Sequence, residues 1–315
     1  MRVLVTGAGG FVGSWLVRDL LAGGHSVFAT HLPGHAAPAN SGAAWLPLDV
    51  TSGDSVASAV ETSRPDAVFH LAGQASVGDS FADPVGTWDV NATGTLRLAA
   101  ALSAGTRLVL ASSAEAYGVV PEAEQPISEA RPLRPTNPYA ASKAAAEMAA
   151  LQAGARGVEA VVARAFNHTG PGQDGRFALP SFARQLAAIR AGRAEPLLRV
   201  GNLSARRDLL DVRDVVRAYV RLAEAGEPGG VYNVCSGEAR SIAGAVDELI
   251  GLSGTRTRVE VDPARVRPVD VPLLLGDDGR MRALGWAPSI PFCQTLGDLL
   301  EHEAREMALD AGVPS

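Results

Sequence analysis

Near the start of the chain, a glycine-rich turn lies between a strand and a helix. This turn limits the possible folds more than any other feature. Residues 2–6 form a short, mostly β-branched run, typical of a strand buried in a parallel sheet. Gly7, Gly10 and Gly13 follow at once, and large apolar residues then recur at helical spacing as far as Gly23. Glycines in this position allow a tight turn and bring backbone close to a pyrophosphate at the helix N-terminus. The order of these features predicts a dinucleotide-binding turn.

The next strand ends without the residue that would select the cofactor. Residues 25–30 predict this strand, and a dinucleotide enzyme normally places Asp or Glu at its end, against the adenosine ribose. Thr30 and His31 stand there instead, with no arginine to bind a 2′-phosphate, so the choice between NAD and NADP stays open. Asp49 follows an apolar run at 45–48 and fits two roles, a bond to the adenine amine or the N-cap of a helix.

Strands and helices alternate along the first half of the chain. Further apolar runs at 67–71, 107–111 and 158–163 predict strands, and helical segments lie between them. Such alternation is typical of the α/β class, with a Rossmann-type doubly wound parallel sheet.

Composition excludes several classes of protein. The chain has 315 residues with 28 Lys and Arg against 34 Asp and Glu, and the net charge of −6 argues against binding to nucleic acid. We expect a soluble protein with no membrane partner, because no apolar run reaches the length of about 18 residues that spans a bilayer. The two cysteines cannot supply a disulfide framework, and a reducing cytoplasmic location fits them. His70 and His168 stand outside any metal-ligand cluster, so we expect structural hydrogen bonds for both and no bound metal.

Residues suited to proton transfer follow the strand at 107–111. Ser113 lies at the C-terminal end of that strand, the edge where open α/β sheets build their active sites. Tyr139 and Lys143 are one turn apart on an alanine-rich helix, so they project from the same face. A nearby ammonium lowers a tyrosine pKa from its usual value of about 10, which favours acid–base catalysis. The pattern predicts that Ser113 holds a substrate oxygen while Tyr139 exchanges its proton, although a surface Tyr–Lys pair has the same spacing.

Four segments of the chain resemble one enzyme family. They are Thr6–Gly13, His70–Gly73, Ser112–Gly118 and Tyr139–Lys143. Together they resemble the extended short-chain dehydrogenase/reductase family that acts on nucleotide-activated sugars, and the resemblance covers nearly the whole chain. It implies an NAD(P)-dependent oxidoreductase.

The resemblance also implies roles for individual residues. Ser113, Tyr139 and Lys143 correspond to the catalytic triad, and Asn91 corresponds to a family asparagine on a helix beside the active site. Glu115 stands where dehydratases of the family carry a glutamate, so it joins the candidate catalytic residues. The implied cofactor contacts are Gly7, Gly10, Phe11, Val12, Gly13, Thr30, His31, Asp49, Val50, Leu71, Ala72, Gly73, Ser112, Tyr139 and Lys143.

A further group of residues is implied for the nucleotide-diphosphate sugar. Asn167 stands where the chain crosses between domains, and Arg206 and Arg207 lie in the segment 201–214, which we expect to place them on a loop. A guanidinium binds phosphate oxygens in a bidentate manner, so we expect Arg207 at the diphosphate. The resemblance adds Arg267 at the diphosphate. The implied substrate contacts are Gln74, Ser113, Asn167, Arg207, Arg267 and Asp270.

The resemblance distinguishes two subgroups of the family. Residues 71–81 and the C-terminal segments are most similar to reductases of GDP-4-keto-6-deoxy-D-mannose, which form GDP-D-rhamnose. GDP-mannose 4,6-dehydratases come next, supported by Glu115, but Ala114 replaces the aspartate of glucose-type dehydratases and residues 29–35 lack the expected arginine. We therefore expect the reductase. A nucleotide-sugar C4 epimerase is a further alternative. The intact Ser113, Tyr139 and Lys143 argue against a non-catalytic regulatory homologue.

The domain organisation follows from the same comparison of motifs. We expect a dinucleotide-binding domain at residues 1–165, rejoined by part of 207–235. Residues 166–206 and 236–315 are expected to form mainly a smaller C-terminal substrate-binding domain. Small residues at 144–153 give the helix after Lys143 a face for close packing, and the resemblance implies a homodimer formed there.

Overall fold

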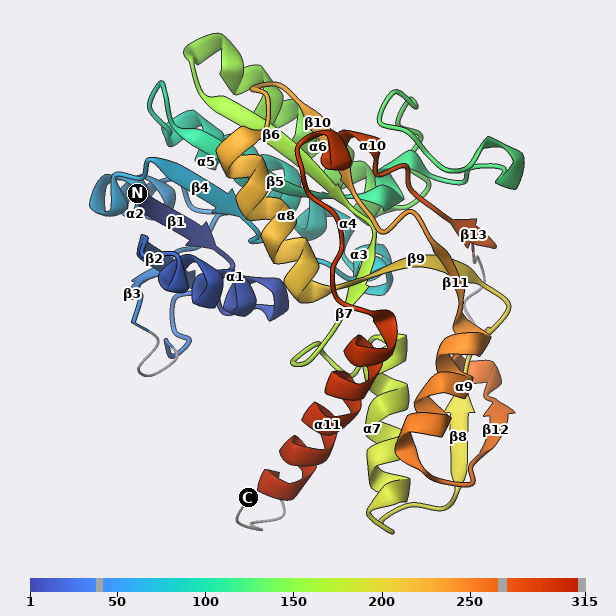
Figure 1. Cartoon of the computed structure of the whole chain (residues 1–315). Coiled ribbons are helices and arrows are strands. Elements are labelled where there is room, and N and C mark those ends of the chain that lie inside the picture. Colours follow the sequence, from blue (N-terminus) through green and yellow to red (C-terminus); the bar gives the residue numbers. More distant parts are fainter. Residues whose placement is uncertain (38–41, 266–270, 311–315) are drawn as a thin grey trace. The chain divides into compact units, whose positions relative to one another are not determined.

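Contacts between residues divide the chain into two compact units, as seen in the computed structural model (Figure 1). The structure describes residues 1–37, 42–265 and 271–310. Unit 1 comprises Met1–Phe166, Val215–Val234 and Asp277–Ala287, and unit 2 comprises Asn167–Asp214, Cys235–Gly276 and Pro288–Ser315. Each unit has its own hydrophobic core.

Unit 1 contains a seven-stranded sheet in which neighbouring strands pair in parallel. The strands are β1 (Arg2–Thr6), β2 (Ser26–His31), β3 (Ala44–Pro47), β4 (Ala67–His70), β5 (Arg107–Ser113), β6 (Glu159–Ala165) and β10 (Val231–Val234). Their order along the sheet is β10-β6-β5-β4-β1-β2-β3. This order reverses between β1 and β4, and open α/β sheets bind ligands beyond the carboxyl ends of the strands at such a point. The predicted Rossmann-type sheet is confirmed.

Helices cover both faces of this sheet. The helices of unit 1 are α1 (Phe11–Ala22), α2 (Gly53–Ser63), α3 (Val77–Ala82), α4 (Pro84–Trp88), the π-helix η1 (Asp89–Thr93), α5 (Gly94–Ala101), η2 (Ala114–Tyr117), η3 (Glu122–Glu124), α6 (Pro138–Leu151), η4 (Gln152–Arg156), most of α8 (Val212–Ala225), and α10 (Gly279–Ala283). Helices α2, α5 and α6 pack on one face through a buried cluster that includes Leu4 and Leu110. Successive strand residues point to opposite faces of the sheet, so the face away from α2, α5 and α6 also carries side chains. Figure 1 shows α1 and α8 in front of that second face.

Unit 2 combines short strands with longer helices. Its elements are β7 (Asn167–Thr169), α7 (Ala178–Arg190), β8 (Leu197–Val200), β9 (Arg206–Asp211), β11 (Ala239–Ser241), α9 (Ile242–Ser253), β12 (Arg258–Val261), η5 (Pro263–Arg265), β13 (Leu273–Leu274) and α11 (Phe292–Asp310). Strands β7, β11 and β13 pair with β9, and β8 pairs with β12. Apolar side chains of α7, α9 and α11, among them Leu186, Leu249 and Leu296, form the core of this unit.

One segment predicted as a loop is a strand. Arg206 and Arg207 lie at the start of β9, where their backbone pairs with Ser241 and Arg240 of β11 on one side and with β13 on the other. Arg206 is exposed and Arg207 is half-buried. The sequence hides this strand because its first residues are charged and show no apolar alternation.

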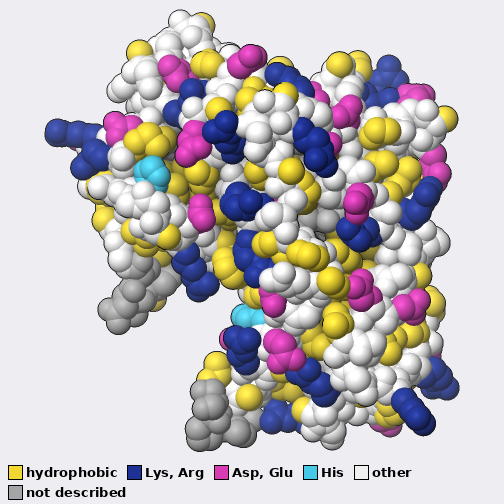
Figure 2. All heavy atoms as spheres, in the orientation of Figure 1, with side chains coloured by type: hydrophobic (Ala, Val, Ile, Leu, Met, Phe, Trp, Pro, Cys, Tyr) yellow, Lys and Arg dark blue, Asp and Glu magenta, His cyan; other side chains and the backbone are white. Residues whose placement is uncertain are grey.

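Acidic and basic side chains are interspersed over the face drawn in Figure 2. This mixture agrees with the similar numbers of the two charge types, 28 and 34. Among the described residues, no helix has the length and apolar character that crossing a membrane requires.

Candidate active site

The glycine turn after β1 is packed so closely that two of its glycines have no room for a side chain. Gly7 has a φ of +68°, and a Cβ there would lie 2.7 Å from the backbone nitrogen of Ala72. A Cβ on Gly13 would lie 2.3 Å from the carbonyl oxygen of Gly7. Gly9, in contrast, has open space around it, since a Cβ there would have no atom within 4 Å. The first turn of α1, which carries Phe11 and Val12, has no side-chain cap.

This arrangement fits the pyrophosphate of a dinucleotide. The N-terminal N–H groups of a helix point outward and attract anions, and open space beside Gly9 leaves room for a phosphate. The tight contacts of Gly7 and Gly13 keep α1 against the end of β1. The residues present therefore suit the cofactor that the sequence predicts.

The residues predicted to contact adenosine lie beside this turn. Thr30 is buried at the end of β2 and its hydroxyl accepts a hydrogen bond from the Gly7 N–H at 3.3 Å. The His31 ring lies 6.3 Å from the Trp45 ring. The Asp49 carboxylate accepts hydrogen bonds from the backbone N–H and the hydroxyl of Thr51 at 2.8 and 2.7 Å.

The alternative role of Asp49 as a helix N-cap is wrong. Helix α2 is capped by Ser52, whose side chain accepts a hydrogen bond from the Ser55 N–H. Asp49 lies three residues earlier and its carboxylate closes a local turn with Thr51. Val50 is buried, and a Cβ on Gly94 would lie 2.9 Å from its Cγ2 methyl group.

The segment after β4 comes close to Lys143 of α6 at Gly73. A Cβ on Gly73 would lie 2.8 Å from Oδ1 of Asn91 and 3.6 Å from Nζ of Lys143. The backbone N–H of Gln74 donates to the same Asn91 oxygen at 2.8 Å. Upstream, the N–H groups of Leu71 and Ala72 lie 3.2 and 3.1 Å from the Thr6 hydroxyl. The predicted residues of β1, of the β4 end and of α6 are thus brought together.

The structure also brings the predicted catalytic residues together. Ser113 ends β5, and its side chain interacts with that of Tyr139 in the first turn of α6. The start of α6 is fixed by Asn137, whose side chain accepts a hydrogen bond from the Ala140 N–H at 2.8 Å. One turn after Tyr139, Lys143 donates from Nζ to the carbonyl oxygen of Ala111 at 2.7 Å.

The electrostatic environment of Tyr139 differs from the sequence-based prediction. Burial raises the pKa of Tyr139 to about 12, the interaction with the Ser113 side chain acts to lower it, and the negative charge of Glu115 raises it further. The predicted lowering is therefore wrong for this structure, because burial outweighs the stabilisation of a phenolate. Burial lowers the pKa of Lys143 to about 8, and the charge of Glu147 opposes that change. The Tyr139 hydroxyl therefore keeps its proton over the neutral range.

The predicted substrate residues of unit 2 are only partly described. Asn167 is exposed at the start of β7. In β9 the Arg207 guanidinium donates to the carbonyl oxygens of Val271 and Arg206 at 2.5 and 2.9 Å. Arg267 and Asp270 lie outside the described residues.

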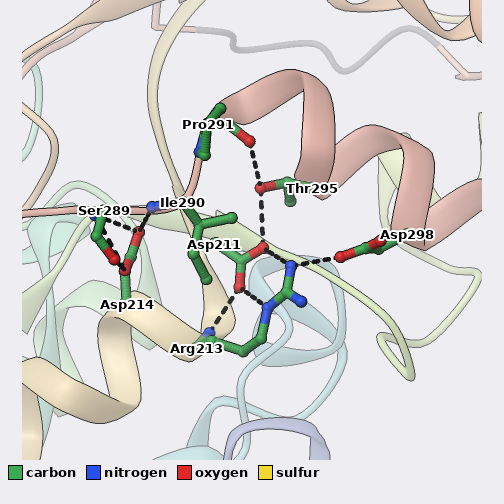
Figure 3. Close-up of polar contacts among 8 residues, drawn as sticks. All are labelled: Asp211, Arg213, Asp214, Ser289, Ile290, Pro291, Thr295 and Asp298. Atoms are coloured by element: carbon green, nitrogen blue, oxygen red, sulfur yellow. Dashed lines mark hydrogen bonds and ion pairs between the residues drawn. The ribbon is translucent and has the colours of Figure 1, made fainter.

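Hydrogen bonds and ion pairs anchor the end of β9 (Figure 3). Arg213 contacts the carboxylates of Asp211 and Asp298, each at 2.7 Å, and so connects the strand end to α11. Asp214 is fully buried and accepts the N–H groups of Ser289 and Ile290 at 3.2 Å. These contacts hold the far end of the strand that carries Arg207.

Comparison with known proteins identifies the family. The model of the family described as GDP-mannose 4,6 dehydratase matches residues 4–299. The chain belongs to this family. This family member is 40% identical to the GDP-6-deoxy-D-mannose reductase of Pseudomonas aeruginosa over 95% of its own length and 96% of the relative. It is 32% identical to GDP-mannose 4,6 dehydratase 2 of Arabidopsis thaliana, over 97% of its own length and 87% of the relative. The solved structure of RMD from Pseudomonas aeruginosa complexed with NADPH matches with a TM-score of 0.85 and 37% identity, covering 97% of this chain and 100% of that one.

The sequence analysis missed the buried acid Glu147 of this family member, which lies on the same helix as Tyr139 and Lys143. Glu147 accepts hydrogen bonds from the Ser112 hydroxyl at 2.5 Å and from the Arg164 guanidinium at 2.7 Å. Glu147 lies one turn beyond Lys143, and this i+4 spacing was the signal in the sequence. The described residues contain no group of three or more His, Cys, Asp and Glu arranged to hold a metal ion.

Proposed function

We propose that the chain is an NAD(P)H-dependent reductase of the C4 ketone of a nucleotide-activated 4-keto-6-deoxy sugar, most specifically GDP-4-keto-6-deoxy-D-mannose, which it converts to GDP-D-rhamnose. The pair of Ser113 and Tyr139 carries this proposal, because their side chains interact one helical turn from Lys143, at the sheet edge beside the glycine turn. The 40% identity to a GDP-6-deoxy-D-mannose reductase supports the choice of substrate.

In this mechanism, the side chains of unit 1 manage the proton and the substrate oxygen. The reduced nicotinamide, when bound, supplies the hydride that C4 receives. The Ser113 hydroxyl polarises the C4 oxygen, and Tyr139 donates its proton to that oxygen, so that the ketone becomes an alcohol. With a pKa of about 12, Tyr139 carries this proton throughout the neutral range. We assign Lys143 to the nicotinamide ribose.

Other residues of unit 1 hold the dinucleotide. The turn from Gly7 to Gly13 and the start of α1 bind the pyrophosphate. Thr30, His31, Asp49 and Val50 line the adenosine end, and either NADP or NAD is accommodated. The segment Leu71–Gly73 and Ser112 complete the cofactor site.

Unit 2 supplies the groups for the nucleotide diphosphate. Arg207 binds the phosphate oxygens, because its guanidinium offers several N–H donors on a half-buried strand residue. Asn167 contacts the sugar nucleotide, as does Gln74 of unit 1. Arg267 and Asp270 are assigned to the diphosphate and to a ribose hydroxyl.

A GDP-mannose 4,6-dehydratase is the second candidate. That reaction needs an additional base. Glu115 lies close enough to Tyr139 for its negative charge to raise the pKa of Tyr139. The Glu115 carboxylate also accepts a long hydrogen bond of 3.4 Å from Asn137. The position of Glu115 is thus the observation that favours the dehydratase.

Product analysis separates these functions. The protein is incubated with GDP-mannose and, separately, with GDP-4-keto-6-deoxy-D-mannose plus NADPH or NADH, and the sugars are identified. A reductase consumes only the second substrate and oxidises the added cofactor, whereas a dehydratase consumes GDP-mannose without net oxidation of cofactor. Tightly bound NAD with no net consumption of NADPH indicates a C4 epimerase. No turnover of any nucleotide sugar contradicts the proposal and favours a regulatory role.

We also propose a homodimer in the cytoplasm. Helices α3, α4 and α5 pack against α6, and together they expose large apolar side chains to solvent. These side chains are Phe81, Val85, Trp88, Leu96 and Met148. A second copy of the chain would cover them, as apolar patches of this kind mark contact surfaces. Sedimentation analysis tests this, with a dimer expected for the natural chain and a larger monomer fraction for Val85→Asp.

A further inference from the structure

A continuous series of buried hydrogen bonds connects the first strand to the helix of the catalytic tyrosine. It begins at Thr6, whose hydroxyl lies 2.7 Å from Nδ1 of His70. Nε2 of His70 lies 3.0 Å from the Thr95 hydroxyl, which donates to the carbonyl oxygen of Asn91 at 2.6 Å. None of these side chains is more than 2% exposed.

Only one tautomer of His70 satisfies every group in this series. A hydroxyl has a single proton, and Thr95 uses it on the carbonyl oxygen of Asn91, so Nε2 of His70 must be the donor to Thr95. Nδ1 is then without a proton and accepts from the Thr6 hydroxyl. The Thr6 oxygen has room to accept the N–H groups of Leu71 and Ala72 as well. His70 is therefore neutral and protonated on Nε2.

The series continues through the side chain of Asn91. Its Nδ2 donates to the Ser142 hydroxyl at 2.9 Å, and Ser142 donates to the carbonyl oxygen of Tyr139 at 2.8 Å. The same amide group pairs with the backbone of Gln74, accepting from its N–H at 2.8 Å and donating to its carbonyl at 3.0 Å. Asn91 thus fixes the backbone at Gln74 and, through Ser142, at Tyr139.

Asn91 lies in the π-helix η1, a wider turn than an α-helix. Isolated π-helical turns in longer helices often occur at functional sites, where they displace a side chain from regular helical register. The bond from His70 to Thr95 reaches the helix one turn beyond Asn91, and the bond from Thr95 returns to the Asn91 carbonyl. The imidazole therefore holds the irregular turn in place.

We propose that His70 is a positioning residue for the reaction: as the neutral Nε2–H tautomer it fixes the π-helical turn of Asn91, and through Asn91 it fixes the backbone at Gln74 and Tyr139. The inference rests on the proposed function, because it assigns Tyr139 as the proton donor. His70 acts through Thr95 and Asn91 and does not contact the substrate. Burial lowers the pKa of His70 to about 3, and the nearby positive charge of Lys143, the charged group that acts on it, lowers it in the same direction.

The tautomer is tested by NMR of the full chain labelled with ¹⁵N-histidine. The chain has six histidines, and comparison with His70→Gln assigns the signals of the missing ring. We expect His70 to remain unprotonated on Nδ1 and protonated on Nε2 from about pH 5 to 8, the range in which an ordinary histidine titrates. A proton on Nδ1, or titration within this range, overturns the proposal. This measurement does not depend on any enzymatic activity, so it stands even where the proposed reaction is wrong.

The positioning role is tested by kinetics of Thr95→Val, which keeps the shape of the side chain and removes the hydroxyl. We expect kcat to fall roughly 10- to 100-fold, since small displacements of catalytic groups have effects of this size. Dinucleotide affinity should change little, whereas the sugar KM can rise together with the fall in kcat, since the series also fixes the backbone at Gln74. The control is Thr87→Val, which removes an equivalent buried bond, 2.7 Å to the Asp83 carbonyl, outside the series. Equal kcat values for the natural chain and a folded Thr95→Val overturn the proposal.

A double-mutant cycle distinguishes positioning from a general loss of stability. The shorter side chain of His70→Asn reaches toward Thr6 but not Thr95, whereas His70→Gln places an amide donor near the position of Nε2. We expect His70→Gln to recover part of kcat and the combination of His70→Asn with Thr95→Val to lose no more than the worse single variant. Losses that multiply in the double variant contradict an action of His70 through Thr95.

Discussion

Glu147 and Arg164 form a buried ion pair, with 2.7 Å between Oε2 and Nη2 and side chains only 0% and 6% exposed. The pair joins α6 to β6. It lies next to Ser112, at the end of the strand that carries Ser113. Arg164 also donates to the Tyr117 hydroxyl at 3.0 Å, and Tyr117 donates to Asn233 in β10 at 2.6 Å. A single buried polar network therefore connects α6 with β6 and β10, the two neighbouring strands at one edge of the sheet.

Substitution of Glu147 by Gln should strongly destabilise the protein. The variant leaves the Arg164 charge buried without its partner, and removal of one member of a buried pair typically costs about 3–5 kcal/mol. Urea unfolding measures this change in the free energy of unfolding. The control is Glu159→Gln, since Glu159 is 42% exposed in its 3.1 Å pair with Arg107. For that variant we expect a loss of about 0–1 kcal/mol. Similar losses for both variants would show that burial does not set the strength of the Glu147 pair.

The same substitution should move the pH profile of kcat. The negative charge of Glu147 raises the pKa of Lys143, which burial has lowered to about 8. Without that charge the pKa of Lys143 falls further, so the ammonium loses its proton at lower pH. We expect the basic limb of the profile, measured between about pH 6 and 10, to shift toward acid. Glu159→Gln should leave the limb in place, and an unchanged limb in a folded Glu147→Gln protein would exclude Lys143 as its origin.

The sequence predicted those parts of the fold and site that depend on short-range patterns. β1, the glycine turn and α1 follow one another without interruption, so the apolar periodicity and the glycine spacing were sufficient. The spacing of Tyr139 and Lys143 likewise placed both on one face of α6.

Features that depend on burial or on distant pairing were not predictable in this way. The pKa of Tyr139 moves in the direction opposite to the prediction, because burial outweighs the other influences on its hydroxyl and the sequence does not show that burial. The strand at Arg206 escaped notice because it is defined by pairing with β11 and β13 rather than by its own residues. The hydrogen bonds of His70 to Thr6 and Thr95 likewise join residues that only the folded sheet brings together.

Substitution of Tyr139 by Phe should nearly abolish reduction of the sugar while leaving dinucleotide affinity intact. The variant lacks the proton donor and its interaction with Ser113, and the loss of one such donor typically costs about 10²- to 10³-fold in kcat. NADPH oxidation measures the rate, and quenching of protein fluorescence measures binding. Tyr232→Phe is the control. Among the contacts described for the Tyr232 hydroxyl, the one hydrogen bond is accepted from the Glu227 N–H at 3.0 Å. A Tyr139→Phe enzyme that keeps most of its rate would contradict the role of Tyr139.

Two glycine substitutions in the same turn should differ in their effect on stability, although both should weaken dinucleotide binding. A Cβ on Gly13 would lie 2.3 Å from the Gly7 carbonyl oxygen, a backbone atom, so Gly13→Ala must displace α1 from the end of β1. We expect a lower melting temperature and the loss of detectable dinucleotide binding, because the N–H groups at the start of α1 move from the phosphate position. Gly9 has no atom within 4 Å of a Cβ, so Gly9→Ala should change the free energy of unfolding by only about 0.5 kcal/mol. Since that methyl group occupies the space assigned to a phosphate, Gly9→Ala should still weaken dinucleotide binding in a titration. Normal binding by both variants would place the pyrophosphate elsewhere.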